Sequence, residues 1–452
     1  MNNTTKPFLL FQGPVKSRSG YGDHTRDLIK SLIEMDIFDI KIAATTWGTC
    51  PETELNANTP INNLMRSMIL TSIQLPKQPD VYVNCSIPSE WQAVGKYNIG
   101  ITAGIETTIA DHSWVEGCNR MDLIIVPSNH SKNVFLSSVY DQINNKTNQK
   151  TGELKITKPI EVLFEGANTE VFRQLSKPQK SIDEQLKNIS EPFSFLYVGH
   201  WLDGKLGHDR KDTGMLVKTF LESFKNKKNA PALILKTSSA TFSVIDRNII
   251  LKKIADIKKT VEGKLPSIYV LHGDLTPEEM NGLYNHPKVK AHISFTKGEG
   301  FGRPLLEASI SGKPVIASGW SGHIDFLDRD NSVLLPGQLK EVDRSARWKG
   351  VINEGTSWFY VDYQNASRIM RDVYKSYKNY LPGARKQAYN SRTNFSLAKM
   401  TEVFTSLIKK YVSTSPAPEQ VKLNLPKLKK TTPNAAQVGP KINLNLPKLK
   451  RV

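Results

Sequence analysis

The sequence is poor in cysteine and contains no long hydrophobic run. Its three cysteines, Cys50, Cys85 and Cys118, are odd in number and widely spaced, so they fit neither a disulfide framework nor the spacing of a zinc site. No apolar stretch reaches the roughly 18 residues that a membrane-spanning helix requires. The apolar segment 8–11 is too short for a signal peptide. These absences predict a cytoplasmic protein with reduced thiols and no transmembrane segment.

Length and charge narrow the class further. A chain of 452 residues is too long for one ordinary domain, so we expect two or three. The formal net charge of +18 favours acidic polymers or anionic surfaces as partners, unless the many lysines serve only solubility. Residues 411–452 hold eight lysines or arginines and one glutamate, and the rest of the chain is basic as well.

Short apolar runs alternate with helical patterns in two successive series. The first series predicts a helix over 23–35 and strands at 8–12, 39–44, 80–84, 96–102 and 123–126. The second series begins at residue 193 and has the same alternation. Such an order is typical of parallel sheets with helices on both faces. We therefore predict an α/β fold with two Rossmann-like, doubly wound domains facing a cleft.

The predicted division of the chain follows from this alternation. It comprises an N-terminal domain over 1–180, a linker over 181–191, a second domain over 192–390, a terminal helix over 391–412 and a disordered basic tail over 413–452. The tail contains the peptide LNLPKLK twice, at 423–429 and 444–450, and its proline excludes a helix interior. Tandem copies favour docking on a partner protein, with a gain by avidity. An anionic polymer or a solubilising tail is the alternative.

The most informative segment runs from residue 291 to residue 322. A strand pattern ends at Thr296, and the loop KGEGFG that follows has three glycines in six residues, so its backbone can approach a ligand closely. Arg303 and Pro304 then open a helix, and a second strand at 314–317 ends in another glycine-containing loop. Loops at the carboxyl ends of parallel strands are where ligands bind in such sheets.

Two glutamates, Glu299 and Glu307, lie on either side of this loop and helix start, with seven residues between them. A carboxylate can accept two hydrogen bonds from a vicinal diol, and a helix N-terminus offers free amides to a phosphate. The sequence from Glu299 to Glu307 resembles the donor-site signature of GT-B glycosyltransferases of the retaining family 4 type. The resemblance implies that Glu299 contacts the donor sugar, Glu307 binds the ribose, and the backbone of Gly300, Phe301 and Gly302 faces sugar and phosphate. A loop acid and a solvated helix acid are the alternative.

The resemblance extends over residues 7–412 and includes two further glycine loops. Residues 17–22 resemble the family's first glycine loop, although Ser19 replaces one glycine, which implies that Gly20 and Gly22 approach the phosphate or the acceptor. An ordinary strand-to-helix turn is the alternative. Residues 272–280 resemble the loop that touches the nucleobase, with Gly273 at its tip.

A pair of cations, Arg210 and Lys211, opens a helix in the second series. The family has an Arg/Lys pair at this point, aimed at the donor diphosphate, and two fixed cations would stabilise the charge on the leaving group. Asp209 and Asp212 flank the pair, so an ordinary charged surface loop is the alternative. If the match to the family motif is shifted along the chain, Lys205 takes the place of this pair as the candidate cation.

The first series contributes one candidate acid, Glu106, in the loop after the strand at 96–102. It could orient the acceptor hydroxyl, with Asp111 and His112 as neighbouring candidates and a helix cap as the alternative. The sequence Asp328-Arg329-Asp330 matches the metal motif of the other main glycosyltransferase fold. The GT-B resemblance implies no obligate metal and no other cofactor, so we do not assign a metal site to this Asp-Arg-Asp motif.

Together these features predict a retaining hexosyl- or pentosyltransferase. It would move a sugar from a UDP- or GDP-linked donor to a hydroxyl of a glycan or lipid-linked sugar. One alternative acceptor is a modified nucleic-acid base, such as hydroxymethylated pyrimidine in DNA, which the basic charge favours. A catalytically idle scaffold that binds nucleotide sugars is the other alternative.

Overall fold

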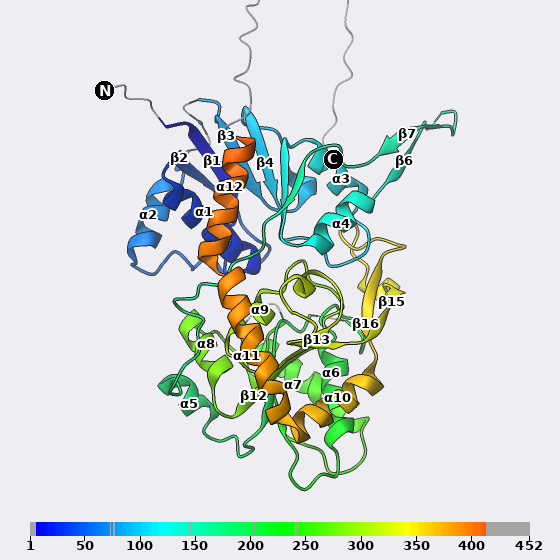
Figure 1. Ribbon diagram of the computed structural model, residues 1–452. Coiled ribbons are helices and arrows are strands. Elements are labelled where there is room, and N and C mark those ends of the chain that lie inside the picture. The colour runs from blue at the N-terminus through cyan, green and yellow to red at the C-terminus, as the bar shows by residue number, and fades with distance from the viewer. Residues whose placement is uncertain are drawn as a thin grey trace, which may run out of the picture. The chain divides into compact units, whose positions relative to one another are not determined.

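The structure is a computed structural model that describes residues 6–412, apart from residues 73, 76, 145, 203, 240 and 241. Within this range the chain builds two six-stranded parallel sheets with flanking helices (Figure 1). We call the parts built on them the first lobe and the second lobe. The repeated LNLPKLK peptides lie outside the described residues.

The sheet of the first lobe has the strand order β2-β1-β3-β4-β5-β8. Its strands are β1 (Phe8–Gly13), β2 (Asp39–Ala44), β3 (Val81–Cys85), β4 (Tyr97–Ile101), β5 (Leu123–Val126) and β8 (Ile160–Val162). All neighbouring strands pair in parallel. Every residue of β3 and β5 is buried, and β5 is a continuous run of Leu, Ile and Val, as expected of a sheet covered by helices on both sides.

Helices connect these strands and place their loops at one edge of the sheet. They are α1 (Gly20–Met35), α2 (Pro60–Met68), η1 (Pro88–Glu90), α3 (His112–Asn119) and α4 (Asn129–Ser137). Several helices begin at a side-chain cap, as at Ser128, whose hydroxyl accepts the N–H of Ser131 at 3.2 Å. An antiparallel hairpin, β6 (Tyr140–Ile143) and β7 (Lys150–Leu154), extends away from the sheet.

The sheet of the second lobe has the strand order β11-β10-β9-β12-β13-β14. Its strands are β9 (Ser194–Val198), β10 (Ala232–Lys236), β11 (Ile268–Leu271), β12 (Val289–Ser294), β13 (Val315–Ser318) and β14 (Val333–Leu335). The order reverses between β9 and β12. This reversal is the topological switch point at which open α/β sheets bind ligands.

The remaining elements surround this sheet or run back from it. They are α5 (Lys180–Leu186), α6 (Thr213–Phe224), α7 (Val244–Lys259), α8 (Pro277–Asn285), α9 (Arg303–Ile310), η2 (Gly322–Asp325), β15 (Gly337–Glu341), η3 (Arg344–Ala346), β16 (Ser357–Val361), α10 (Tyr363–Lys375), α11 (Tyr377–Asn394) and α12 (Leu397–Tyr411). Strands β15 and β16 form a separate antiparallel pair.

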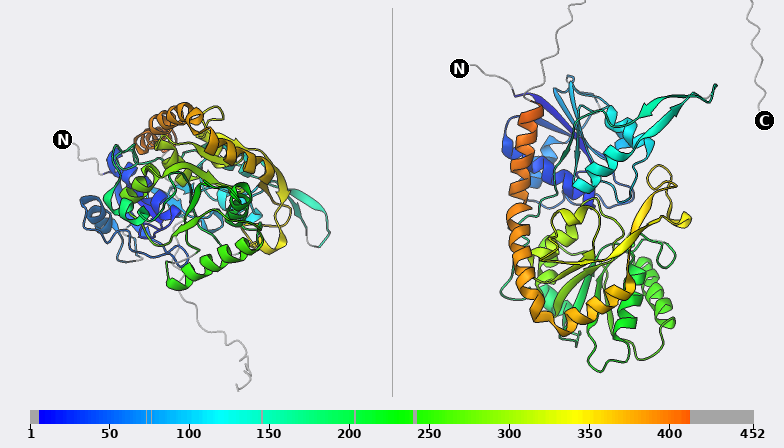
Figure 2. Two further views of the ribbon diagram at one scale, coloured as in Figure 1. Left: turned by 90° about the horizontal axis from the view of Figure 1, so that it is seen from below. Right: turned by 45° about the vertical axis from the view of Figure 1, so that its right-hand side comes forward.

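Helix α12 returns from the second lobe to the first (Figure 2). Its residues Met400, Phe404 and Ile408 are buried in the same hydrophobic cluster as the first-lobe strands. The hydroxyls of Thr401 and Ser31 on α1 hydrogen-bond at 2.8 Å. The terminal helix predicted from the sequence therefore packs on the first lobe.

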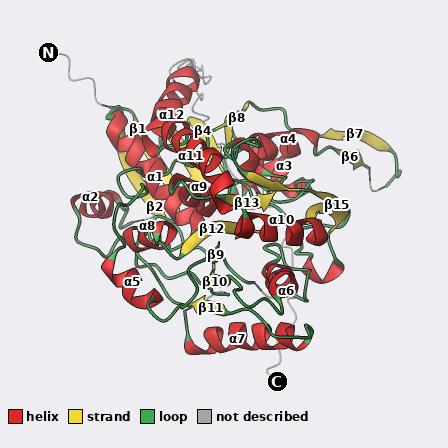
Figure 3. Cartoon of the chain, turned by 60° about the horizontal axis from the view of Figure 1, so that its bottom comes forward, coloured by secondary structure: helices red, strands yellow, loops and turns green. Residues whose placement is uncertain are grey.

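The two predicted doubly wound domains are present, with differences in detail. Part of the predicted linker, 181–191, forms α5, whose Ile182 and Leu186 are buried in a second-lobe cluster. The predicted terminal helix, 391–412, is interrupted at Phe395 and Ser396, so that its first residues belong to α11 and the rest to α12. The β6–β7 hairpin stands clear of the lobes in Figure 3. Within the described residues, no helix combines the length and apolarity needed to cross a bilayer.

Candidate active site

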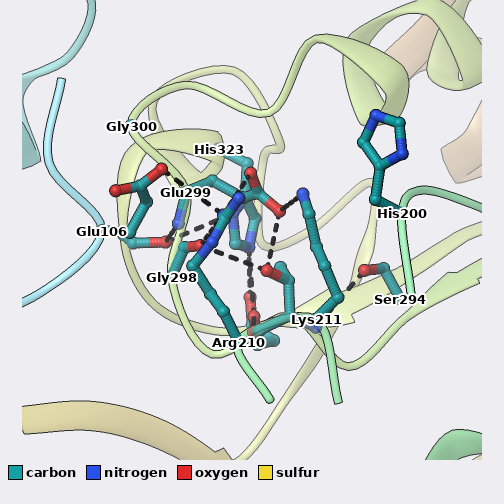
Figure 4. A network of polar contacts seen from close by, with 12 residues as sticks. Glu106, His200, Arg210, Lys211, Ser294, Gly298, Glu299, Gly300 and His323 are labelled. Atoms are coloured by element: carbon teal, nitrogen blue, oxygen red, sulfur yellow. Dashed lines mark hydrogen bonds and ion pairs between the residues drawn. The ribbon is translucent and has the colours of Figure 1, made fainter. Parts of the chain in front are cut away.

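A compact ionic network joins the loops that follow β9 and β12 (Figure 4). Arg210 Nη1 lies 3.2 Å from Glu299 Oε2 and donates a hydrogen bond of 2.8 Å to the Gly298 carbonyl. Lys211 Nζ forms an ion pair with Glu299 Oε1. The Thr296 hydroxyl donates to the same carboxylate oxygen at 2.7 Å. The Glu299 carboxylate is thus held by two cations and a hydroxyl.

The surroundings keep Glu299 ionised. Burial alone would raise its pKa, but the charges of Lys211 and Arg210, with hydrogen bonds from Lys211 and Thr296, outweigh burial and lower the pKa of Glu299 to about 2. Burial lowers the pKa of Lys211 despite its carboxylate neighbour. The network therefore concentrates formal charge at the switch point, where water is largely excluded.

The first lobe contributes Glu106 to the same network. Its Oε1 lies 3.6 Å from Arg210 Nη1, so Arg210 lies between carboxylates of both lobes. The structure thus brings together all four residues that the sequence singled out for catalysis, Glu106, Arg210, Lys211 and Glu299. Their catalytic roles stay predictions.

A buried lysine that no sequence pattern indicated, Lys297, supports the loop that carries Arg210 and Lys211. The side chain of Lys297 is fully buried, and its Nζ donates to the carbonyls of Gly207 at 2.5 Å and Asp209 at 3.0 Å. The carboxylate of Asp212 lies 3.4 Å away, and the Tyr360 ring centroid lies 4.3 Å away. Lys297 therefore ties the β9–α6 loop to the β12–α9 loop and fixes both cations opposite Glu299.

The glycine loop after β12 packs directly against the first lobe. A Cβ atom on Gly298 would lie 1.9 Å from the Glu106 carbonyl oxygen, and one on Gly300 would lie 2.0 Å from that of Ala103. The Ser128 hydroxyl donates to the Gly300 carbonyl at 2.6 Å. Only glycine permits this approach of two backbones. Gly300 consequently faces the first lobe.

The other loop residues of the signature have different environments. The Phe301 side chain is buried in the core against Phe326, with ring centroids 5.0 Å apart, so only its backbone could face a ligand. Gly302 precedes α9 with φ of 100°, in the left-handed region. Pro304 has no N–H, and the Leu305 N–H donates to the Gly302 carbonyl at 2.9 Å, so it is mainly the positive end of the helix dipole that favours an anion there.

Ser321 is a second feature that the sequence did not indicate. It is buried, and its hydroxyl accepts the Glu299 N–H at 2.9 Å. Its φ of 82° and ψ of −164° belong to a region that is essentially reserved for glycine. Ser321, in this strained conformation, therefore fixes the backbone of Glu299.

The second signature glutamate, Glu307, lies outside this network. Its carboxylate accepts a hydrogen bond from Arg303 Nε at 3.2 Å and one from the Tyr284 hydroxyl at 3.4 Å. Arg303 also forms an ion pair of 2.8 Å with Asp27 on α1, which links the lobes. Burial raises the pKa of Glu307 to about 7, although Arg303 opposes the shift. The two signature glutamates therefore differ widely in acidity.

The predicted glycines of the other loops also lie apart from Glu299. Gly20 and Gly22 form the first turn of α1, where the Ser19 hydroxyl accepts the Gly22 N–H at 3.1 Å. The Gly273 carbonyl accepts a hydrogen bond of 2.6 Å from Lys236 Nζ. The neighbouring Asp274 forms an ion pair with Arg18 of the first lobe.

The remaining sequence candidates have structural partners or are exposed. Asp111 caps α3, where its carboxylate accepts the Ser113 N–H at 2.8 Å, and His112 lies exposed on that helix. Lys205 is exposed on the β9–α6 loop. Asp328 accepts backbone N–H groups within its own turn. In the described part of the chain, no group of three or more His, Cys, Asp and Glu side chains could hold a metal ion.

Comparisons with known proteins match the fold. No protein-family model matches the sequence, and no curated protein sequence does. A glycosyltransferase from Rickettsia africae ESF-5 superimposes with a TM-score of 0.58 at 13% identity, over 91% of this chain and 100% of that chain. Sucrose-phosphate synthase from Thermosynechococcus elongatus gives 0.60 at 12% identity over 91% and 100%.

A third solved structure is HepE from Anabaena in complex with UDP-glucose. It superimposes with a TM-score of 0.56 at 11% identity, over 89% of this chain and 100% of that chain. These structures share the arrangement of two parallel-sheet α/β lobes. The predicted GT-B fold is thereby confirmed.

We predict that Lys297→Met destabilises the protein by about 3–5 kcal/mol, because it leaves buried carbonyl oxygens and a buried carboxylate without their cation. Denaturant-induced unfolding measures the change. Lys205→Met is the matched control, since Lys205 is exposed on the loop that Lys297 anchors, and it should change stability by less than about 0.5 kcal/mol. Equal stabilities of the two variants would contradict the anchoring role.

Proposed function

We propose that this protein is a glycosyltransferase that moves a sugar from a nucleoside-diphosphate donor to an acceptor hydroxyl. The observation that carries the proposal is the convergence of Arg210, Lys211 and Glu299 beside the N-terminus of α9, within a GT-B fold. Two fixed cations and the positive end of the α9 dipole suit a diphosphate. The ionised Glu299 suits the hydroxyls of the transferred sugar.

The donor would lie across the carboxyl edge of the second sheet. Its diphosphate would share Arg210 and Lys211 with Glu299, and its ribose diol would be bound by Glu307 on α9. The base would lie toward Gly273. The HepE structure contains UDP-glucose, which supports a uridine nucleotide over a guanosine one for this chain. We infer no obligate metal, because the two cations can balance the leaving diphosphate.

The step itself needs no covalent enzyme intermediate. The bond between the anomeric carbon and the β-phosphate oxygen breaks, the acceptor oxygen bonds to that carbon, and the acceptor proton passes to the leaving diphosphate. Because attack and departure then occur on one face, the anomeric configuration is retained, as in the family 4 type. Glu106, across Arg210 from Glu299, would orient the acceptor hydroxyl from the first lobe.

Two alternatives fit the site less well. A catalytically idle scaffold would not require Glu106 and Glu299 on either side of the same arginine. The other alternative, a nucleic-acid acceptor, is supported by the net charge of +18 but by none of the contacts at this site.

We propose that the transferred sugar is a hexose or a pentose, and that the reaction takes place in the cytoplasm.

We predict that Lys211→Gln weakens UDP binding by about tenfold or more, because it removes one charge-assisted contact to phosphate. Calorimetric titration with UDP measures the affinity. A panel of UDP- and GDP-sugars, read out by nucleotide release, measures turnover, which should fall as well. Lys205→Gln on the same loop is the control and should bind UDP as the unaltered protein does. Unchanged affinity in Lys211→Gln, or no UDP or GDP binding by the unaltered protein, would contradict the proposal.

The raised pKa of Glu307 predicts a pH dependence of nucleotide affinity. Below its pKa of about 7 the carboxyl is protonated and loses acceptor capacity for the ribose diol. UDP affinity should therefore fall by up to about tenfold per pH unit below that value and level off above it. Glu307→Gln cannot titrate, so the affinity ratio of the two proteins isolates Glu307 from the phosphate of UDP. A ratio that stays constant between mildly acidic and mildly alkaline pH would exclude Glu307 as the titrating ligand.

A further inference from the structure

A cavity lined by residues of both lobes lies beside the glycine loop. It has a volume of about 400 Å³, within the usual range of small-molecule sites. One wall is a face of α4 that runs from Asn129 to Ser137 in the first lobe, and the other is the segment 320–325 of the second lobe. We call it the α4 pocket.

The lining of the α4 pocket combines apolar side chains with polar groups that are almost all uncharged. It presents the amides of Asn129 and Asn133, several hydroxyls, and no lysine or arginine. Burial lowers the pKa of His130 to about 4, so this imidazole is neutral. The one ionisable acid is Asp325, whose carboxylate accepts hydrogen bonds from the Asn129 backbone at 2.7 Å and side chain at 3.2 Å. A phosphodiester in this pocket would meet a carboxylate and no cation.

An aromatic wall completes the pocket. The indole of Trp320 contacts the ring of His130 edge-on, with centroids 4.6 Å apart. Trp320 also stacks on Phe359, with ring centroids 6.3 Å apart, and these two contacts fix the orientation of the indole. Amides, hydroxyls and a rigid aromatic ring offer both hydrogen-bond donors and acceptors, and an apolar face. That combination suits a neutral ring that carries many hydroxyls.

The α4 pocket is physically coupled to the reaction site. Ser321 lines the pocket, and its hydroxyl accepts the Glu299 N–H at 2.9 Å. A Cβ atom on Gly298 would lie 3.2 Å from the Trp320 ring, so the indole rests on the glycine loop. Thr108, from the loop that carries Glu106, lines the opposite side. A ligand in the pocket would therefore touch the supports of both Glu299 and Glu106.

We propose that the α4 pocket binds a neutral saccharide unit of the acceptor, next to the sugar that receives the transferred group. The inference rests on the proposed glycosyl transfer and names its acceptor class as an uncharged glycan. A nucleic-acid acceptor is disfavoured because its phosphates would face Asp325 without a neutralising lysine or arginine in the lining.

Saccharide binding to the full chain tests the proposal. The probes are the neutral disaccharides maltose, cellobiose, lactose and chitobiose, each added with UDP, and a single-stranded oligonucleotide. Saturation-transfer NMR detects binding, and titration gives the affinity. Asn133→Trp would fill the pocket, and its exposed position on α4 leaves the fold intact. Asn248→Trp, at an exposed asparagine of α7, is the matched control.

We expect at least one disaccharide to bind, with affinity reduced about tenfold or more by Asn133→Trp and unchanged by Asn248→Trp. UDP affinity should be equal in all three proteins, which separates this inference from the proposed function. The proposal is overturned if UDP binds but no disaccharide does at up to about 20 mM, where a ligand with Kd of about 1 mM would saturate. It is also overturned if Asn133→Trp leaves disaccharide binding unchanged, or if it weakens oligonucleotide binding instead.

Discussion

The site depends on one interaction, the carboxylate of Glu299 held between Arg210 and Lys211. Burying three charges costs desolvation energy that their attraction repays only when the geometry is tightly fixed. Two neighbouring residues fix that geometry. The Lys297 ammonium anchors the β9–α6 loop, which carries both cations. The hydroxyl of the strained Ser321 accepts the Glu299 N–H. A site assembled this way keeps its charges oriented before any ligand binds, which is the condition for electrostatic stabilisation of a leaving diphosphate.

The two glutamates of the signature have opposite pKa shifts because their environments differ. Glu299 has its pKa lowered to about 2 by two cations, whereas burial raises that of Glu307 to about 7 beside a single arginine. That arginine, Arg303, also reaches Asp27 on the first lobe. Together with the contact of the glycine loop on residues 103–106, it makes the relative position of the lobes part of the proposed donor site. Opening the lobes would therefore alter both glutamates.

Much of this arrangement could be predicted from the sequence. Alternating apolar and helical patterns predicted the two parallel sheets, and the resemblance to the GT-B donor-site signature singled out Arg210, Lys211 and Glu299. The supports could not be predicted, because they depend on tertiary context. A lysine in a glycine-rich loop is ordinarily solvated, so nothing in the sequence marked Lys297 as buried. The positive φ of Ser321 and the contact between α9 and α1 arise only when distant segments pack together. Short polar helices such as α5 lacked a clear apolar period.

Glu299 occupies the two cations that the proposed donor diphosphate would bind. UDP has a diphosphate but no transferable sugar, so calorimetric titration of Glu299→Gln with UDP isolates this competition. Neutralising the carboxylate should leave Arg210 and Lys211 free for phosphate, so UDP should bind more tightly than to the unaltered protein, and sugar transfer should be lost. Weaker UDP binding by Glu299→Gln would show that the carboxylate does not compete with phosphate for these cations.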